Sequence, residues 1–332
     1  MTLDDFRNLI LNSPEPCAAS RDAVRSRADD ILRPRGALKR LDDVAVWVAG
    51  WHRTDRPKVS APVGLVFAAD HGVARDEQVS AYPIEVTAAM LAAYNSGRST
   101  LSAFAEVAGA QVIAHDVGVA RPTGNIAIED ALTADDLIRC FGAGIDAVKE
   151  LSADLIVIGE MGIGNTTVAA ALSAANVGGS VDTWVGRGTG VDDDGYRRKL
   201  SAVQRAVDRV RNDSDPLEIL RKIGGSEIAA MVGAIVGARH RSIPVLLDGY
   251  VVTAAASVLF QISPRALDHT LVGHCSAEPG HRRLLDHLGM DHLLNLEMRL
   301  GEGSGAMAAV PLVKMACAGI SNVPTFGEWF GA

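Results

Sequence analysis

The amino-acid sequence predicts an α/β fold in which a parallel sheet is flanked by helices. Short, continuous apolar runs recur along the chain, at residues 63–69, 110–115, 154–158 and 243–247. Runs of this kind are typical of strands that are buried on both faces, as the strands of parallel sheets are. Each run ends at a polar residue or a glycine, and a helical stretch follows it. This succession of strand, loop and helix indicates strands joined by crossover helices.

Helices are predicted for residues 4–52, ahead of the first strand. Apolar side chains between Leu38 and Trp51 recur at helical spacing, with charged side chains on the opposite face. The sequence Arg33-Pro34-Arg35-Gly36 predicts a loop within this region, and the polar, proline-bearing residues 53–62 predict a linker. We therefore expect a small helical domain at residues 1–60.

Another Ala-rich helix is predicted near the end of the chain, at residues 306–320. Because few polar residues interrupt it, we expect it to pack on the core or on the N-terminal helices. Residues 306–332 would then join the small helical domain, and residues 61–305 would form the α/β domain.

The predicted strands end at residues that can carry chemistry. The first run leads into Asp70-His71-Gly72, the second into Asp116, the third into Gly159-Glu160 and the fourth into Asp248-Gly249. Helices are expected after the third and fourth strands, over residues 166–175 and 250–260, and residues 269–273 form a weaker candidate strand. Open α/β sheets bind their ligands at the carboxyl ends of the strands, so a binding site is expected there.

The composition argues against several classes of protein. The chain of 332 residues carries a formal net charge of −8, which argues against binding to nucleic acid or to an anionic membrane. Its four cysteines are scattered without a CxxC pair, which is typical of reduced thiols. The N-terminus lacks the apolar stretch of a signal peptide, and no uninterrupted apolar run reaches membrane-spanning length. We expect a soluble, cytoplasmic protein.

The segment from Leu296 to Ala306 offers a single carboxylate, Glu302, between Gly301 and Gly303. Glycines allow a backbone to approach a ligand closely, and the apolar run that follows predicts a helix that enters the core. Burial at such a position is expected to raise the pKa of the carboxylate, which would make Glu302 a usable general base. The alternative is that Glu302 only faces the helix dipole.

Two glycine-rich loops are candidates for binding a phosphate. The first, Gly159–Thr167, follows a predicted strand and opens a helix, where free N–H groups suit a phosphate. It has neither the Walker sequence nor the dinucleotide spacing. The second runs from Gly186 to Gly190, and Arg197-Arg198-Lys199 follow it. As alternatives, the first loop only packs a helix on a strand, and the three charges form a solvated helix face.

A slot for a small planar ligand is expected where a loop passes into a helix, at Val79–Met90. Ser80, Tyr82 and Met90 would supply apolar walls and a few polar atoms, which such ligands require. The alternative is a helix start with an ordinary cap.

A metal site is the less favoured interpretation of two further segments. Asp70-His71 and His274–His281 together offer acidic, sulfur and imidazole groups, but Pro279-Gly280 breaks any helix that would align them and no zinc spacing is met. Ser276 and the turn beside it are expected to line a ligand loop instead.

Taken together, these motifs resemble the nicotinate-nucleotide–dimethylbenzimidazole phosphoribosyltransferase family of cobalamin lower-ligand synthesis. The resemblance implies a Rossmann-like parallel sheet, a small helical domain built from both chain ends, and a homodimer whose active sites are completed by the partner's small domain. The matching segments follow the family order over about residues 65–315 and are Ala69–Val73, Val79–Met90, Asp116–Val119, Gly159–Thr167, Gly186–Gly190, Asp248-Gly249, Ser276–Gly280 and Met298–Ala306.

The resemblance also implies roles for individual residues. Glu302 matches the catalytic base of the family, and Glu160 matches a second active-site glutamate. No metal and no cofactor enter the implied scheme. The positions that match nucleotide binding are Gly162, Gly164, Asn165, Thr166, Gly186, Gly188, Lys199 and Ser276, and those that match base binding are Ser80, Tyr82 and Met90.

The implied reaction transfers phosphoribose from nicotinate mononucleotide to a nitrogen of 5,6-dimethylbenzimidazole or a related base, and releases nicotinate. The chain departs from the family at Ile84, where many members carry a glutamine, at Gly273, which replaces a serine, and at Arg33–Lys39, which replaces a Lys-Pro-Pro-Gly-Ser-Leu-Gly pattern. The sequence leaves the acceptor open among dimethylbenzimidazole, another benzimidazole, adenine and a phenol.

Two functions of other classes compete with this one. A metal-dependent hydrolase would use Asp70, His71, His274 and His281. A non-catalytic nucleotide sensor would use only the glycine-rich loops, and it would bind the mononucleotide without releasing nicotinate.

Overall fold

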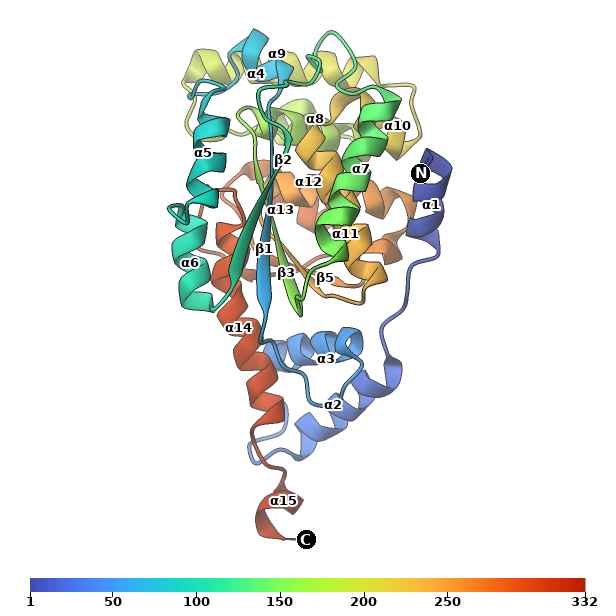
Figure 1. Cartoon of the computed structure of the whole chain (residues 1–332), viewed down its shortest axis with the longest axis vertical. Helices are drawn as coiled ribbons and strands as arrows, with labels where there is room; N and C mark the ends of the chain where they lie inside the picture. Colours follow the sequence, from blue (N-terminus) through green and yellow to red (C-terminus); the bar gives the residue numbers. More distant parts are fainter. Residues whose placement is uncertain (332) are drawn as a thin grey trace.

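The computed structural model describes residues 1–331, which fold around one six-stranded sheet (Figure 1). The strand order is β2-β1-β3-β4-β5-β6, and every neighbouring pair is parallel. Parallel neighbours require crossover connections, and helices supply them here. The strands are β1 (Pro62–Ala69), β2 (Gln111–Gly118), β3 (Leu155–Met161), β4 (Val245–Leu247), β5 (Thr270–His274) and β6 (His292–Leu294).

The predicted fold class is confirmed, because the four apolar runs and the weaker fifth one form β1 to β5. Strand β1 lies inside the sheet and is buried along its whole length, which is why its sequence is apolar throughout. Strand β2 forms an edge, and its pairing with β1 continues through Asp116 to Gly118, beyond the predicted end of the strand at His115. Strand β6, the opposite edge, was not predicted; it has three residues, all of them half-buried.

Helices cover both faces of the sheet, and each face has its own apolar core. Val63, Leu65 and Phe67 of β1 belong to the core on one face, and Val66 belongs to the core on the other. The first core is formed with α7 (Ala134–Lys149), α8 (Asn165–Val177), α10 (Pro216–Ile223), α11 (Ser226–His240) and α12 (Tyr250–Ile262), and the second with α3 (Arg40–His52), α6 (Thr100–Ala108) and α14 (Ser304–Ser321). The helices predicted at residues 166–175, 250–260 and 306–320 are α8, α12 and α14.

Seven further helices and two 3₁₀ turns complete the described part of the chain. They are α1 (Leu3–Leu11), α2 (Ala18–Asp30), α4 (Gly72–Glu77), α5 (Val86–Asn95), α9 (Asp193–Arg209), α13 (Pro279–Leu288) and α15 (Phe326–Phe330), with the short 3₁₀ turns η1 (Val181–Thr183) and η2 (Pro264–Leu267).

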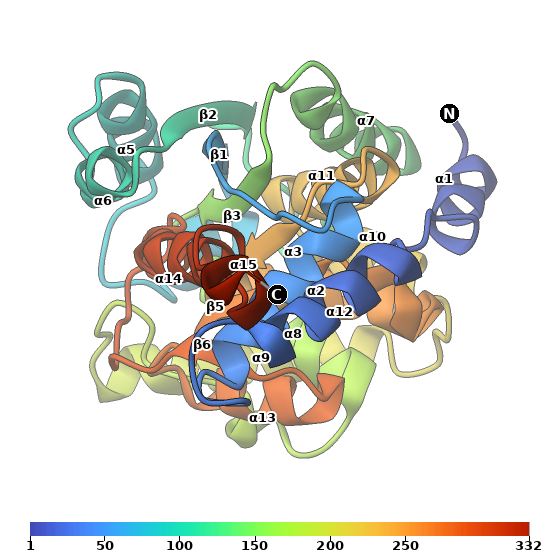
Figure 2. The ribbon, with the colours of Figure 1, turned by 90° about the horizontal axis from the view of Figure 1, so that it is seen from below.

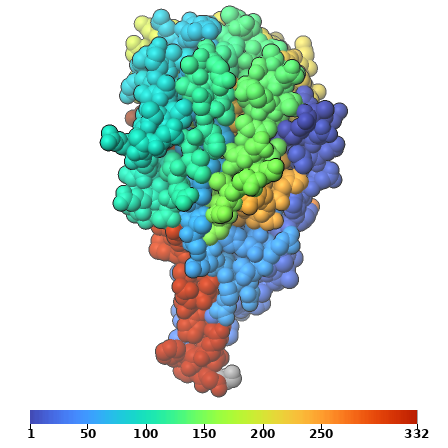
Figure 3. Space-filling model, in the orientation of Figure 1, coloured from blue at the N-terminus to red at the C-terminus, as the bar shows by residue number. Residues whose placement is uncertain are grey.

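The helices α2, α3 and α15 gather with the second half of α14 beyond the amino ends of the strands (Figures 1 and 2). In the space-filling view, the second half of α14 and the helices α2 and α3 lie at the narrow end of an elongated molecule (Figure 3). Helix α1 is separate from this group. Its Phe6 stacks on Phe141 of α7 with ring centroids 3.9 Å apart, and its Arg7 pairs with Asp215 at 2.8 Å. The domain division at residue 60 stays a prediction, and α1 makes its contacts with the α/β part.

Among residues 1–331, one helix, α14, is long and apolar enough to cross a membrane by length and composition alone. However, 56% of it is buried, and it packs on α3, α6 and β5. Lys314 interrupts its apolar sequence and donates a hydrogen bond to the carbonyl of Ala108 at 2.6 Å. These contacts are those of a core helix, so its apolar sequence is explained by packing inside the protein.

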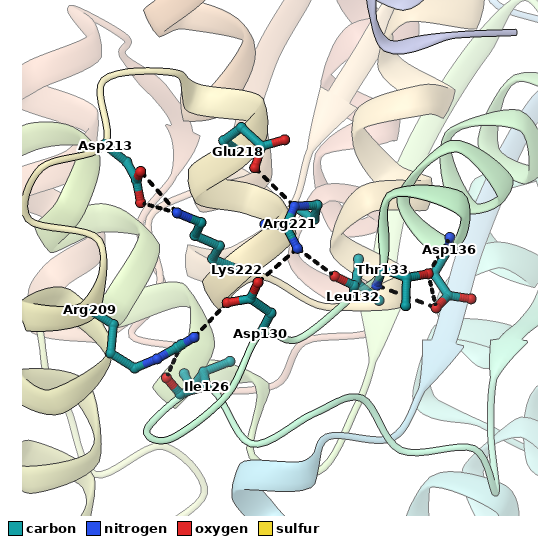
Figure 4. A network of polar contacts seen from close by, with 10 residues as sticks. All are labelled: Ile126, Asp130, Leu132, Thr133, Asp136, Arg209, Asp213, Glu218, Arg221 and Lys222. Carbon is teal, nitrogen blue, oxygen red and sulfur yellow. Dashed lines mark hydrogen bonds and ion pairs between the residues drawn. The ribbon is translucent and has the colours of Figure 1, made fainter.

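A network of charged side chains fixes the connection between β2 and α7 to two helices (Figure 4). Asp130 in this connection accepts hydrogen bonds from Arg209 of α9 at 2.5 Å and from Arg221 of α10 at 2.8 Å. Next to Arg221, Lys222 pairs with Asp213 at 2.8 Å. The network therefore connects the segment between β2 and α7 to the C-terminal part of α9 and to α10.

Candidate active site

A cavity of about 420 Å³ opens where the carboxyl ends of β3, β4 and β5 meet the helices that follow them. Glu160 belongs to the end of β3, Gly249 follows β4, and Ser276 follows β5. This is the edge at which open α/β sheets bind ligands. The cavity brings together all of the predicted site residues except Gly186: they are Ser80, Tyr82, Met90, Glu160, Gly162, Gly164, Asn165, Thr166, Gly188, Lys199, Ser276 and Glu302.

Gly186 lies just outside the lining of the cavity. A Cβ atom at this position would collide with the carboxylate of Glu278, which does line the cavity. Gly186 therefore contributes space, because its missing side chain lets Glu278 approach the second glycine-rich loop.

One end of the cavity is suited to an anion. Lys199 of α9 is only 1% exposed, and its Nζ donates a hydrogen bond to the Thr166 hydroxyl at 3.0 Å. Within the described residues, no carboxylate lies at ion-pair distance from this Nζ. Burial lowers the pKa of Lys199 to about 8, against the opposing effect of Glu278. Helix α8 begins at Asn165 beside it, and the N–H groups of a helix start add further attraction for an anion.

Two buried glutamates also line the cavity. Glu302 is 3% exposed, and its Oε1 accepts hydrogen bonds from the backbone N–H of Leu101 at 3.0 Å and from the Ser304 hydroxyl at 2.9 Å. Glu160 is 8% exposed, and its Oε2 accepts a hydrogen bond from the Asn165 side chain. The backbones also meet, because the N–H of Glu302 donates to the carbonyl of Glu160 at 3.1 Å.

The environment of Glu160 disfavours its charged form. Burial raises the pKa of Glu160 to about 8, in spite of the hydrogen bond from Asn165, and the neighbouring acids Glu227, Asp248 and Glu302 add to the rise. A carboxylic acid with this pKa is mostly protonated at pH 7 while the cavity is empty. A cation that enters the cavity would favour the ionised form.

The loop that carries Glu302 has an unusual backbone. Glu302 has a φ of 64°, in the left-handed region that residues other than glycine seldom occupy. A Cβ atom on Gly301 would collide with the carboxylate of Glu160, so only glycine allows this approach. Backbone strain of this kind persists only where the surrounding structure enforces it. The contacts around Glu302 therefore fix its position.

The predicted slot at Ser80, Tyr82 and Met90 has a further wall that sequence reasoning missed. Tyr94 of α5 lines the cavity, and its hydroxyl has no hydrogen-bond partner among the residues that the structure describes. Burial, together with the nearby charge of Glu302, raises the pKa of the Tyr94 hydroxyl. The signal was present in the sequence, because Val86, Met90 and Tyr94 recur every four residues and so share one face of a helix.

The rim of the cavity contains other residues to which the sequence assigned no role. They include Arg187, which donates to the carbonyl of Val191 at 3.0 Å and pairs with Asp193 at 2.6 Å. Arg299 and Leu300 line the cavity beside Glu302 and lie within the glycine-containing segment that the sequence singled out.

The residues of the alternative metal site are not brought together. His71 is paired with Glu227 through Nε2 and Oε1 at 2.7 Å, in the fully buried interior. The rings of His274 and His281 are 6.3 Å apart, and Nδ1 of His281 accepts a hydrogen bond from the N–H of Ser276 at 2.9 Å. In the described part of the chain, no three His, Cys, Asp or Glu side chains form a group that could hold a metal ion. The hydrolase alternative is therefore not favoured.

Comparison with known proteins agrees with the motifs and with the fold. A family model described as Phosphoribosyltransferase matches residues 13–329. A protein of Ruegeria pomeroyi, named nicotinate-nucleotide–dimethylbenzimidazole phosphoribosyltransferase, is 46% identical over 326 residues, which cover 98% of this chain and 96% of the relative. A protein of Sinorhizobium medicae with the same name is 44% identical over 330 residues, which cover 99% and 96%.

Solved structures show the same relationship. The crystal structure described as CobT from Thermus thermophilus has a TM-score of 0.90 at 38% identity and covers 94% of this chain and 98% of that chain. A second structure from the same organism, described as a nicotinate-nucleotide–dimethylbenzimidazole phosphoribosyltransferase, has a TM-score of 0.89 at 36% identity and covers 95% and 99%. The chain therefore belongs to the nicotinate-nucleotide–dimethylbenzimidazole phosphoribosyltransferase family.

Proposed function

We propose that this chain transfers phosphoribose from nicotinate mononucleotide to a nitrogen of a benzimidazole-type base. The products are an α-riboside phosphate, which would serve in assembly of the cobalamin nucleotide loop, and nicotinate. The observation that carries the proposal is a single cavity that is lined by a buried lysine and by two buried glutamates. The names of relatives that are 44% and 46% identical over nearly the whole chain support it.

The 5′-phosphate of the donor fits the part of the cavity that contains Lys199. Lys199, the Thr166 hydroxyl and the start of α8 would hold the 5′-phosphate. Gly162, Gly164 and Gly188 would form the loops around it, and Ser276 also lines this cavity. The phosphate is remote from the bond that breaks. Its binding energy can therefore be used to position C1′ for reaction.

The chemical step needs a base and needs no acid. The nicotinate leaving group is a cationic pyridinium, so the electron pair of the broken C1′–N bond returns to the pyridine nitrogen without protonation. A new C1′–N bond forms to the acceptor, and the proton on the other nitrogen of the acceptor passes to the Glu302 carboxylate. Glu160 would stabilise the positive charge that develops on the ribose, and the cationic donor would favour its ionised form.

The acceptor base would occupy the slot between α5 and the Glu302 loop. Met90 and Val86 offer apolar contacts for a planar ring, and Ser80, Tyr82 and Tyr94 offer hydroxyl groups at its edges. A slot of this kind is typical of sites for small, flat ligands. It does not by itself choose among dimethylbenzimidazole, other benzimidazoles, adenine and a phenol.

A homodimer and a cytoplasmic location stay predictions. The dimer is supported by three exposed aromatic side chains on α15, Phe326, Trp329 and Phe330, of which Trp329 is 63% exposed. Exposed apolar groups in one place are typical of interaction surfaces. Light scattering of the purified protein should give twice the mass of the chain, and the mass of a single chain at working concentration would contradict the dimer.

The reaction is tested by following nicotinate release with a panel of acceptor bases and with the Glu302→Gln variant. Glutamine keeps the shape of the side chain but cannot take the proton, so turnover should fall by about 10²- to 10⁴-fold, the range for the loss of a general base. The affinity for nicotinate mononucleotide, measured by calorimetry, should barely change. Near-native turnover in Glu302→Gln would refute the role of the glutamate, and mononucleotide binding without nicotinate release by the native protein would identify a sensor.

A further inference from the structure

The helix that follows Glu302 begins at a residue that cannot cap it. The first N–H groups of any helix lack partners within the helix, and a side chain at the N-cap position usually accepts one of them. The N-cap of α14 is Gly303, which has no side chain and has a φ of 95°. This helix start is nevertheless buried, where an unpaired N–H group would be costly.

Asp248, at the end of β4, supplies the missing acceptors. Its Oδ1 accepts a hydrogen bond from the N–H of Ala306 at 2.8 Å, and its Oδ2 accepts one from the N–H of Gly303 at 3.1 Å. One fully buried carboxylate thus bonds both the N-cap residue and the third residue of the helix. In an ordinary capping box, two side chains of the helix itself share this work.

These bonds fix the backbone on one side of Glu302, while Glu160 fixes the other side. The N–H of Glu302 donates to the carbonyl of Glu160 at 3.1 Å, and the next N–H along the chain, that of Gly303, donates to Asp248. Two consecutive residues of this turn have positive φ values, 64° and 95°. Such a turn reverts to a more favourable backbone unless its peptide groups are held.

Asp248 does not line the cavity. Its Oδ1 lies 3.3 Å from Nε2 of His274 on the neighbouring strand β5. The cavity-lining residues at this end include Gly249, Glu302 and Gly301, and Asp248 is behind them. Asp248 can therefore act on the cavity through the loop that it binds and through the effect of its charge on Glu160, and the experiment below separates the two.

We propose that Asp248 is the positioning residue of the proposed base: its carboxylate caps α14 from β4 and thereby holds Glu302 in the strained conformation that aims it at the acceptor. The inference rests on the proposed function of Glu302. In this proposal, the orientation of the Glu302 side chain depends on a residue that lies far away in the sequence.

The test is Asp248→Asn. This change preserves the size of the side chain but leaves only one oxygen that can accept a hydrogen bond. Whichever way the amide is turned, its NH₂ group faces one of the two N–H donors, so one bond is lost and the turn can relax. We expect kcat to fall by about 10- to 100-fold, the size expected when a catalytic group moves by about 1 Å. The Kd for nicotinate mononucleotide should stay within about twofold of the native value, because the phosphate end of the cavity is untouched.

A double-variant cycle separates positioning from a general structural effect. If Asp248 acts only through Glu302, Asp248→Asn should have no further effect on kcat in the Glu302→Gln background. If Asp248→Asn instead loosened the whole fold, or acted through the charge of Glu160, its fold loss in kcat would multiply with that of Glu302→Gln in the double variant. Losses that multiply, a loss that appears in Kd, or native kcat in Asp248→Asn would each overturn the proposal.

Two further variants serve as a control and as a second route. Asp215 caps α10 by accepting from the N–H of Leu217 at 3.1 Å, away from the cavity, so Asp215→Asn should lower the Tm while kcat stays native. If Asp248→Asn does not fold, Gly303→Ala disturbs the same turn, because alanine is strained at a φ of 95°. It must show the same kcat-only loss that disappears in the Glu302→Gln background, and any other result overturns the proposal. Failure of the proposed function would be visible separately, as native turnover in Glu302→Gln alone.

Discussion

Replacement of Lys199 by methionine tests the phosphate site most directly, because it removes the charge and keeps the apolar stem. The folded protein releases the Lys199 proton near pH 8, whereas a lysine in an unfolded chain keeps its proton up to about pH 10.4. Below pH 8 the buried charge therefore lowers the free energy of unfolding. This penalty shrinks as the pH rises from about 8 to about 10.

The two effects of Lys199→Met should have opposite signs. The lowering of the pKa to about 8 corresponds to roughly 3 kcal/mol, so at pH 7 the free energy of unfolding of the empty protein should rise by up to about 3 kcal/mol. The bound state loses a hydrogen bond between a cation and a phosphate, worth about 1.5–3 kcal/mol, so use of the mononucleotide should weaken by about 10- to 150-fold. A variant that is more stable and binds the mononucleotide less tightly would show that the native charge serves ligand binding at a cost in stability.

The assay compares nicotinate mononucleotide with its dephosphorylated riboside as donors. The second ionisation of a phosphate monoester lies near pH 6, and Lys199 titrates near pH 8 in the empty cavity. The ionisation of Glu160 near pH 8 acts on both donors, because both carry the pyridinium cation. The affinity for the mononucleotide relative to that for the riboside should thus be highest between about pH 6 and pH 8 and should decline above that range. Lys222→Met, at a lysine paired with Asp213 outside the cavity, is the matched control.

The reasoning about Lys199 would be refuted by equal losses on the two donors, which would show that the lysine supports the cavity without binding phosphate. It would also be refuted by a decline in this relative affinity above pH 8 that persists in Lys199→Met. Urea denaturation at pH 7 and pH 10 checks the stability argument, because the difference between the native protein and the variant should narrow at the higher pH.

Two further predictions concern stability away from the cavity. Burial alone would raise the pKa of Asp130, but hydrogen bonds from Arg221 and Arg209 outweigh it and hold the pKa below its usual value; the stabilisation is thus present above about pH 4 and lost as the pH falls further. Asp130→Asn should lower the free energy of unfolding by about 0.5–1 kcal/mol at pH 7, and an equal effect at pH 2 in urea denaturation would contradict this. Phe6→Ala should cost about 3–5 kcal/mol, because Phe6 is fully buried against Phe141, and an unchanged urea midpoint would show that α1 is dispensable.

The strands could be predicted where burial on both faces imposes a continuous apolar sequence. Strand β1 meets this condition because one core takes Leu65 and Phe67 and the other takes Val66. An edge strand has only one neighbour, and its exposed positions accept polar residues, so the pattern weakens at β2. It fails altogether at β6, whose three residues leave too little sequence for any period to appear.

Helix α1 shows a different limit of sequence reasoning. Its spacing identifies an apolar face, and Phe6 and Ile10 are on that face. Spacing does not say which surface the face will cover. The partner of α1 is Phe141, far along the chain, so the assignment of α1 to the N-terminal helical group was a matter of proximity in sequence alone.

The site could be predicted to the extent that its signals are local. Glu302 between two glycines and the loop before α8 each carry their pattern within a few residues. The capping of α14 depends on Asp248, which lies 55 residues before Gly303 in the sequence, and no spacing rule predicts this contact. Likewise, Tyr94 shows its helical spacing in the sequence, but only the folded chain places it beside Glu302.

The hydrogen bonds of the two glutamates explain why they would play different parts. Oε1 of Glu302 accepts both bonds to this carboxylate, from Leu101 and Ser304, and leaves Oε2 without a hydrogen-bond partner among residues 1–331. An oxygen that is fixed in place and unoccupied is what a general base requires. The carboxyl of Glu160 instead holds the Asn165 side chain, and its pKa near 8 means that it gains charge most readily when a cation is present. In the proposed reaction the donor would bring that cation and the acceptor would bring the proton, so each glutamate would act on a different substrate.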